Sequence, residues 1–190
     1  MPSLPRREVI DESVVGIYHI WSRVALREFL LGLDPKTGRS FRHRKKVIRK
    51  RNEALVSIFA IECLEHAVLD NHFHQILRNR PDVVAQWSDR EVAERWLRLK
   101  RSALELKPPP KEERIAALVA NREELAEIRR RLSSISWFMA YLREPLARAF
   151  NLEGGTTGTS FWAGRFGCSR LEDELAVLVC CLYVCMNLIR

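Results

Sequence analysis

The spacing of apolar and polar residues divides the chain into a first part with strand patterns and a second part with mainly helical patterns. Residues 14–25 are rich in β-branched and aromatic side chains, which is typical of a strand. Residues 42–59 predict a helix whose later turns are apolar. Residues 61–69 and 72–80 predict two strands, joined as a hairpin by a tight turn at Asp70 and Asn71.

Further along, residues 82–153 predict a series of helices, and residues 160–171 predict another strand or extended segment. Residues 172–190 are apolar nearly all round, which predicts a buried helix. This order of elements predicts an α+β fold, an antiparallel sheet with helices packed on one face. We expect a single domain over residues 1–190, with a helical insertion at about 82–134.

Length and composition exclude the secreted and membrane classes. A chain of 190 residues with a hydrophobic fraction of 47% suits one compact domain with its own core. The first residues contain no apolar stretch of the kind found in a signal peptide, and the longest apolar run is shorter than the ~20 residues that cross a bilayer. The five cysteines are therefore interpreted as reduced thiols of a cytoplasmic protein that does not bind membranes.

The net charge of +8 originates in one segment, residues 39–51, which contains no acid. Outside it, the 24 remaining basic residues equal the 24 acidic ones. Like charges at helical spacing repel, so a polyanionic partner explains this segment better than a purely structural face does. We expect nucleic-acid phosphates to be contacted by its eight basic residues, which are Arg39, Arg42, Arg44, Lys45, Lys46, Arg49, Lys50 and Arg51.

Two pairs of residues are suited to metal-dependent chemistry. His72 and His74 alternate along a predicted strand, so both imidazoles project from one face and can share a divalent ion. Tyr183 and Asn187 are the polar pair in the last apolar run, and their spacing of four residues places them on one helix face. If this helix packs on the sheet, the amide oxygen of Asn187 can be a third ligand. The alternative is that the histidines are solvated or hydrogen-bonded, that Tyr183 lies at the core edge and that Asn187 caps the helix.

Five segments in order resemble one family of enzymes. The segments are Tyr18-His19, EHAVLDNHFHQILRNRPDVV, ISWFMAYLREPLARAFN, FWAGRFGCSRL and YVCMNLIR. Together they resemble the REP-associated tyrosine transposases, which are single-tyrosine HUH transposases. The resemblance implies a ferredoxin-like, RRM-like antiparallel sheet that carries the two histidines on a central strand. A helix then brings the nucleophilic tyrosine and an amide ligand to them.

Carried over to this sequence, the resemblance implies His72, His74 and Asn187 as ligands of a divalent metal, Mg²⁺ or Mn²⁺. It implies Tyr183 as the nucleophile that cleaves and rejoins single-stranded DNA through a 5′-phosphotyrosine. The expected function is thus DNA transposition and recombination by an HUH endonuclease of a mobile element. The expected partner is single-stranded DNA with a hairpin, bound by a monomer or a homodimer.

The sequence departs from the family pattern at its end. Leu188 stands where the family usually has a proline, and the chain stops at Arg190, so we expect a shortened C-terminus. This leaves open a second function, a catalytically inactive and basic nucleic-acid-binding remnant of such a transposase. A third is a small zinc protein that uses Cys63, His66 or the terminal cysteines. His19 and His66 are interpreted as structural residues.

Overall fold

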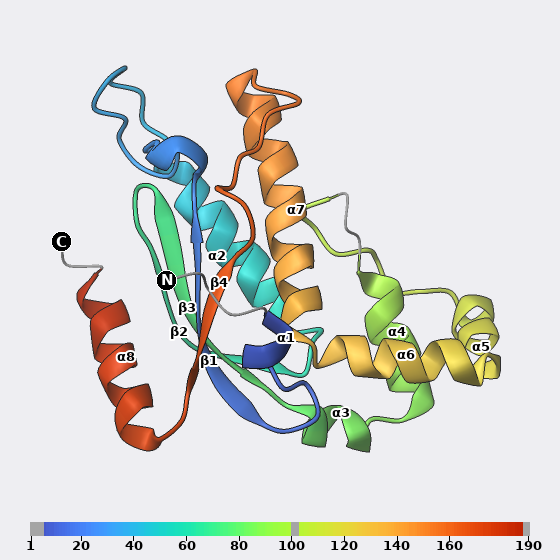
Figure 1. The fold of residues 1–190 in the computed structure, drawn as a ribbon. Helices are drawn as coiled ribbons and strands as arrows, with labels where there is room; N and C mark the ends of the chain where they lie inside the picture. The colour runs from blue at the N-terminus through green and yellow to red at the C-terminus, as the bar shows by residue number, and fades with distance from the viewer. Residues whose placement is uncertain (1–5, 100–102, 188–190) are drawn as a thin grey trace.

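The computed structural model describes residues 6–99 and 103–187 (Figure 1). Its centre is an antiparallel sheet in the order β2-β3-β1-β4, so β1 and β3 are the inner strands. The strands are β1 (Gly16–Arg23), β2 (Ile61–Val68), β3 (His72–Asn79) and β4 (Gly167–Leu171). The predicted α+β class is confirmed, and this strand order is that of a ferredoxin-like sheet.

The residues of β1 alternate between the two faces of the sheet. Tyr18 and Ile20 are fully buried on the first face, whereas His19 and Trp21, which alternate with them, are only partly buried. In the pairing of β1 with β3, Trp21 lies opposite His74 and Arg23 lies opposite His72. This register places the side chains of His19 and His74 on one face, the second face of the sheet.

Two helices cover the first face, α2 (His43–Val56) and α7 (Ile135–Gly154). Ser134 accepts a hydrogen bond from the amide of Trp137 and caps the start of α7, and Gly155 ends it with a φ of 67°. The main core lies between these helices and the sheet, and includes Tyr18, Ile20, Ile48, Leu55, Phe73, Leu77, Phe138, Leu142 and Leu146.

The last helix, α8 (Glu174–Met186), lies on the second face, away from α2 and α7 (Figure 1). Asp173 caps its start by accepting a hydrogen bond from the amide of Ala176 at 2.7 Å. Val184 packs with Ala67 and Ile76 of the sheet in a small separate core. The prediction that the helices pack on one face is therefore wrong for α8.

The prediction that this helix is buried is also wrong. Because α8 is the only helix on its face among the described residues, one side of it meets the sheet and the other side meets solvent. The exposed apolar residues of α8 are Leu175, Leu178, Val179, Leu182 and Met186. None of the described helices is long and apolar enough to cross a membrane.

Four further helices lie on the side of the molecule away from α8 (Figure 1). They are α3 (Pro81–Gln86), α4 (Asp89–Arg98), α5 (Glu112–Ala120) and α6 (Arg122–Leu132). Their mutual contacts include ion pairs that join one helix to another. Arg90 of α4 pairs with Glu112 of α5, and Arg129 of α6 pairs with Asp89 of α4. Two short elements complete the described chain, α1 (Arg6–Val9) and the 3-10 turn η1 (Ala25–Arg27).

Two of the eight basic residues predicted to contact DNA are buried in the protein, so the prediction is wrong for them. Arg44 is 1% exposed, donates hydrogen bonds to the carbonyls of Leu30 and Phe150, and pairs with Glu153 at 3.1 Å. Arg51 is 2% exposed and donates to the carbonyl of Tyr141. Both guanidinium groups hold α2 to neighbouring segments, which is why α2 tolerates two arginines on its inner side.

We expect Arg44→Ala to lower the free energy of unfolding by about 3 kcal/mol, because the buried carbonyls of Leu30 and Phe150 lose their donor. Urea unfolding followed by circular dichroism measures this. The matched control is Lys46→Ala on the exposed side of α2, which should change the free energy by less than about 0.5 kcal/mol. Equal losses in the two variants would contradict a structural role for Arg44.

Candidate active site

Three histidines from the two inner strands meet on the second face of the sheet. The rings of His72 and His74 are 5.0 Å apart, and the ring of His19 stacks on that of His74, also at 5.0 Å. The structure therefore brings together the two histidines predicted from the sequence. It adds His19, which the sequence analysis interpreted as structural. The signal that could have found it is the position of His19 on a central strand next to the histidine strand.

The hydrogen bonds of this cluster engage the same ring nitrogen of both candidate ligands. His72 Nδ1 is 2.6 Å from Oδ1 of Asn71, and His74 Nδ1 is 2.8 Å from Nε2 of His19. Nε2 of His74 is buried and has no hydrogen-bond partner among the described residues. Such buried and unpartnered polar atoms are rare, and the arrangement leaves Nε2 as the atom that a ligand would take.

The three imidazoles of the cluster have lowered pKa values in this environment. Burial lowers the pKa of His74 to about 4, with smaller contributions from His19 and His72. Burial also lowers the pKa values of His19 and His72 below the usual value. All three rings are therefore neutral near pH 7, and a neutral imidazole has a lone pair for a metal or a hydrogen-bond donor.

Tyr183 reaches the cluster from α8. Its ring stands edge-on to His74 at 5.6 Å and to His19 at 6.2 Å, and the residue is 50% exposed. Next to it, Cys185 donates a hydrogen bond from Sγ to Glu65 of β2 at 3.0 Å, and this bond raises the pKa of the thiol. The tyrosine is thus held beside the histidines while one side of its ring stays open to solvent.

Asn187 lies at the end of α8, where it acts as a cap. Its Nδ2 donates to the backbone carbonyl of Tyr183 at 2.9 Å, and among the hydrogen bonds of the described residues it has none with a histidine. This bond engages the amide nitrogen. The amide oxygen, the atom that a metal would take, is not part of it. The structure thus brings Tyr183 to the histidines, whereas the contact of Asn187 is with its own helix. Leu188 lies outside the described residues.

Within residues 6–99 and 103–187, no group of three or more His, Cys, Asp or Glu side chains is arranged to hold a metal ion. The described cysteines are all free thiols. Burial raises the pKa of the Cys63 thiol, which weakens it as a thiolate ligand. The third alternative, a zinc protein that uses Cys63, His66 or the terminal cysteines, is therefore not supported by a ligand cluster of this kind in the described chain.

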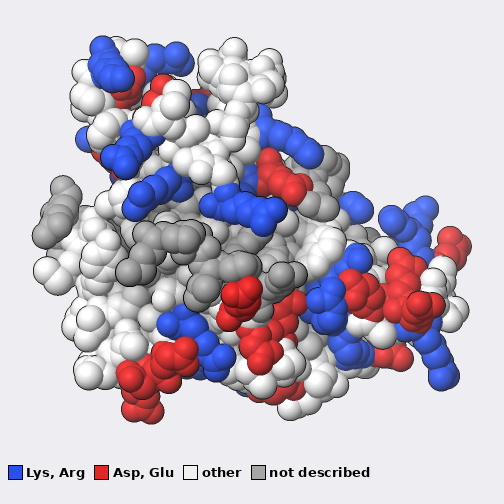
Figure 2. Space-filling view, in the orientation of Figure 1, with Lys and Arg blue, Asp and Glu red and all other residues white. Residues whose placement is uncertain are grey.

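The basic segment 39–51 contacts the β2–β3 hairpin at its turn. Since α2 packs on the first face, most of its length is separated from the histidines by the sheet. Lys45 is its link to the hairpin, through an ion pair with Asp70 at 2.7 Å. Figure 2 shows Lys and Arg at the upper end of the molecule, while Asp and Glu lie mainly over its lower and right-hand parts. The exposed Lys and Arg residues of the segment are Arg39, Arg42, Lys46, Arg49 and Lys50.

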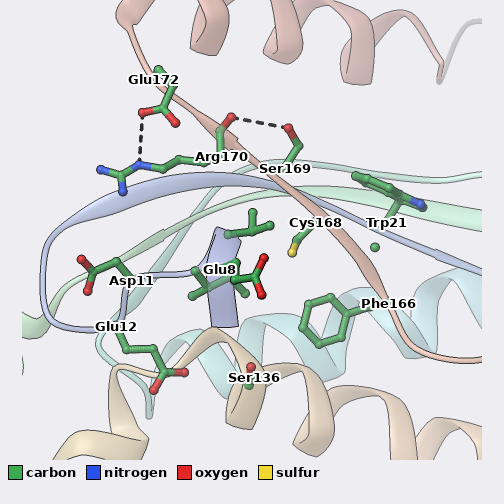
Figure 3. Close-up of a pocket in the computed structure, with 13 residues that line it drawn as sticks. Glu8, Asp11, Glu12, Trp21, Ser136, Phe166, Cys168, Ser169, Arg170 and Glu172 are labelled. Carbon is green, nitrogen blue, oxygen red and sulfur yellow. Dashed lines mark hydrogen bonds and ion pairs between the residues drawn. The ribbon is translucent and has the colours of Figure 1, made fainter. Parts of the chain in front are cut away.

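A cavity of about 1020 Å³ lies at the β4 edge of the sheet, between α1, β4 and the start of α7 (Figure 3). Its lining includes Trp21 and Phe166, and the carboxylates of Glu8 and Asp11 also line it. The guanidinium of Arg170 there is paired with Glu172 at 3.3 Å. Because its charged lining is mainly acidic, this cavity does not suit a phosphate group.

Comparison of the sequence with protein families gives no match, and comparison with curated proteins gives none. The fold is similar to a solved structure described as "Structure of the REP associates tyrosine transposase bound to a REP hairpin". The TM-score is 0.50 and the identity 13%, over 98% of this chain and 73% of that chain. At this identity the similarity shows a shared fold. It agrees with the fold that the sequence resemblance implied.

We expect His74 to carry its proton on Nδ1 at neutral pH, because a proton on the buried Nε2 would be a donor without a partner. Long-range ¹⁵N–¹H correlation spectra of the histidine rings measure which nitrogen is protonated. In His19→Ala the acceptor of this bond is lost, so the preference for Nδ1 should weaken. An Nε2–H form of His74 in the parent protein would contradict the hydrogen-bond pattern described above.

Proposed function

We propose that this protein is a DNA strand-transfer enzyme that cleaves and rejoins single-stranded DNA bearing a hairpin, with Tyr183 as the nucleophile. The observation that carries the proposal is the half-exposed ring of Tyr183, edge-on to the paired histidines at 5.6 Å. Because Tyr183 is half-exposed, a large substrate can approach its phenol from solvent. The shared fold with a tyrosine transposase structure supports the same function.

In the proposed reaction the phenolic oxygen of Tyr183 attacks the phosphorus of a DNA phosphodiester. The phenol loses its proton as the O–P bond to the tyrosine forms, the bond from phosphorus to the 3′ oxygen breaks, and that oxygen takes up a proton, so the protons balance. The products are a 5′-phosphotyrosine and a free 3′-hydroxyl. Attack by a 3′-hydroxyl on the phosphotyrosine reverses these steps, rejoins the strand and returns the phenol, so no energy source is needed.

The two imidazoles of His72 and His74 supply nitrogen donors suited to a divalent ion. Nε2 of His74 is buried without a partner, and Nδ1 of both His72 and His74 is held by a neighbouring side chain, the pattern seen in histidine ligands. His72 and His74 would hold the ion, with Asn187 as the candidate third ligand. Mg²⁺ or Mn²⁺ bound there would offset negative charge on the phosphate oxygens. His19 and Asn71 would orient the ligand rings.

The nucleophile is tested with a hairpin oligonucleotide that carries single-stranded tails, incubated with the protein and Mn²⁺. We expect a covalent protein–DNA adduct that is resolved by denaturing gel electrophoresis and is absent in Tyr183→Phe, since phenylalanine lacks the attacking oxygen. The matched control is Tyr18→Phe, which removes a phenol on the first face that bonds to Asp11. An adduct that persists in Tyr183→Phe would rule out Tyr183 as the nucleophile.

The metal site is tested by titrating Mn²⁺ into the protein and following free Mn²⁺ by electron paramagnetic resonance, which needs no substrate. We expect His72→Ala and His74→Ala to abolish specific binding, and His19→Ala to weaken it by roughly tenfold through loss of the orienting bond. His43→Ala on α2 is the control, because His43 pairs with Glu153 on the first face. Unchanged Mn²⁺ affinity in His74→Ala would be incompatible with the proposed ligands.

A catalytically inactive nucleic-acid-binding protein is a second candidate function, and the position of Asn187 favours it. Its side chain bonds to the carbonyl of Tyr183 in its own helix, and the described residues show no hydrogen bond between it and the histidines. This candidate predicts salt-dependent binding of the hairpin by the exposed basic residues, without a requirement for Mn²⁺ and without an adduct. The adduct experiment therefore distinguishes the two candidates.

A further inference from the structure

A pocket beside the histidines is lined by two arginines, an asparagine and His72. Its volume is about 310 Å³, and its lining residues are Arg23, Arg27, Asn71 and His72. Arg23 is the last residue of β1 and is paired with His72 across the sheet, whereas Arg27 belongs to η1. The pocket thus adjoins one of the two candidate ligands, at the end of the hairpin.

Both guanidinium groups of this pocket lack a protein partner in the described chain. Arg23 and Arg27 are exposed, and neither side chain makes an ion pair or a hydrogen bond within residues 6–99 and 103–187. Other arginines are neutralised, as in α6, where Arg130 and Arg131 both contact Glu127. Two unpaired guanidinium groups that converge on a pocket are suited to an anion with several oxygens, which a phosphate provides.

The backbone next to the pocket is held in a conformation that residues with a side chain rarely adopt. Leu26 has a φ of 54° and Arg27 a φ of 58°, both in the left-handed region. Asn71 holds this turn, since its carbonyl accepts from the amide of Val24 at 2.8 Å and its Nδ2 donates to the carbonyl of Arg27 at 3.4 Å. Strain of this kind persists where the surrounding structure enforces it, often at ligand sites.

Asn71 therefore connects the strained turn to the histidine cluster. The same side chain that donates to the carbonyl of Arg27 accepts a hydrogen bond from Nδ1 of His72 at its Oδ1, 2.6 Å away. Asn71 would therefore help to position both an anion in the pocket and a ligand at Nε2 of His72. This juxtaposition distinguishes Arg23 and Arg27 from the basic residues of α2, which lie on the other face of the sheet.

We propose that Arg23 and Arg27 bind a backbone phosphate of single-stranded DNA next to the scissile phosphate, in the pocket beside His72. The inference rests on the proposed function, because it assigns the path of the strand on either side of the phosphate that Tyr183 attacks. A second phosphate held by two guanidinium groups fixes the direction of the strand. It thereby keeps the breaking bond aligned with the tyrosine oxygen.

The test uses Tyr183→Phe protein, which is expected to bind DNA without cleaving it, and a DNA hairpin with single-stranded thymidine tails. The adduct formed by the parent protein first locates the cleavage site. Each phosphate of the tails is then replaced in turn by a neutral methylphosphonate, and the dissociation constant is measured by fluorescence anisotropy with Mn²⁺. We expect one substitution adjacent to the cleavage site to weaken binding by about tenfold.

In a protein that also carries Arg23→Gln and Arg27→Gln, the same methylphosphonate should cause no further loss, because its protein partners are already absent. The slope of log affinity against log salt concentration should fall by about 0.7 in that protein, because one phosphate of the single strand is no longer neutralised. Arg114→Gln on α5 removes an exposed arginine of the helical block and serves as the control, with less than a twofold change expected. Circular dichroism melting checks that all variants fold.

Three results would overturn the assignment. The first is a methylphosphonate that weakens binding equally with and without the two arginines. The second is a loss of affinity in Arg114→Gln equal to that in the protein with both arginines replaced. Either result would show that the pocket does not bind the strand, while cleavage by Tyr183 would be unaffected. If the parent protein forms no adduct and the Tyr183→Phe protein does not bind the hairpin, the proposed function fails and the pocket assignment fails with it. The adduct and the binding measurement therefore separate the two failures.

Discussion

A strand turns alternate side chains to opposite faces, and this protein uses the two faces of one sheet for different purposes. On β3, Phe73 and Leu77 belong to the main core beneath α2 and α7, whereas His72 and His74 point to the face that carries α8. Because the first face supplies most of the buried apolar surface, the second face is able to carry polar side chains. The histidine cluster depends on this division.

The position of Tyr183 depends in turn on a helix that packs on the sheet through one side only. The apolar contacts of α8 with the sheet involve Val184 in a small core, and Cys185 adds a hydrogen bond to Glu65. The opposite side of α8 exposes leucine, valine and methionine side chains. By contrast, α2 is fixed to its surroundings by Arg44 and Arg51, which are buried and hydrogen-bonded. The candidate nucleophile is thus carried by the helix with the smaller core.

The strands, the hairpin and α2 were predictable from the sequence, because alternation and turn residues are local signals. The burial of Arg44 and Arg51 was not predictable, since a run of basic residues does not indicate which of its side chains face the core. The same limit applies to α8, where an apolar composition predicted burial but one layer of packing leaves half the helix exposed. His19 was missed because the pairing of β1 with β3, which brings it to His74, is a long-range contact.

A charge count therefore locates a basic segment without locating a binding surface. The segment 39–51 supplies the whole net excess of charge, yet two of its basic residues are buried, Lys45 is paired with Asp70, and the sheet separates α2 from the histidines. Arg23 and Arg27 add nothing unusual to the composition, but they are unpaired in the described chain and lie beside His72. For a polyanion that must reach Tyr183, the unpaired charges on the face that carries the histidines matter more than the larger number of charges on α2, because the sheet lies between α2 and the histidines.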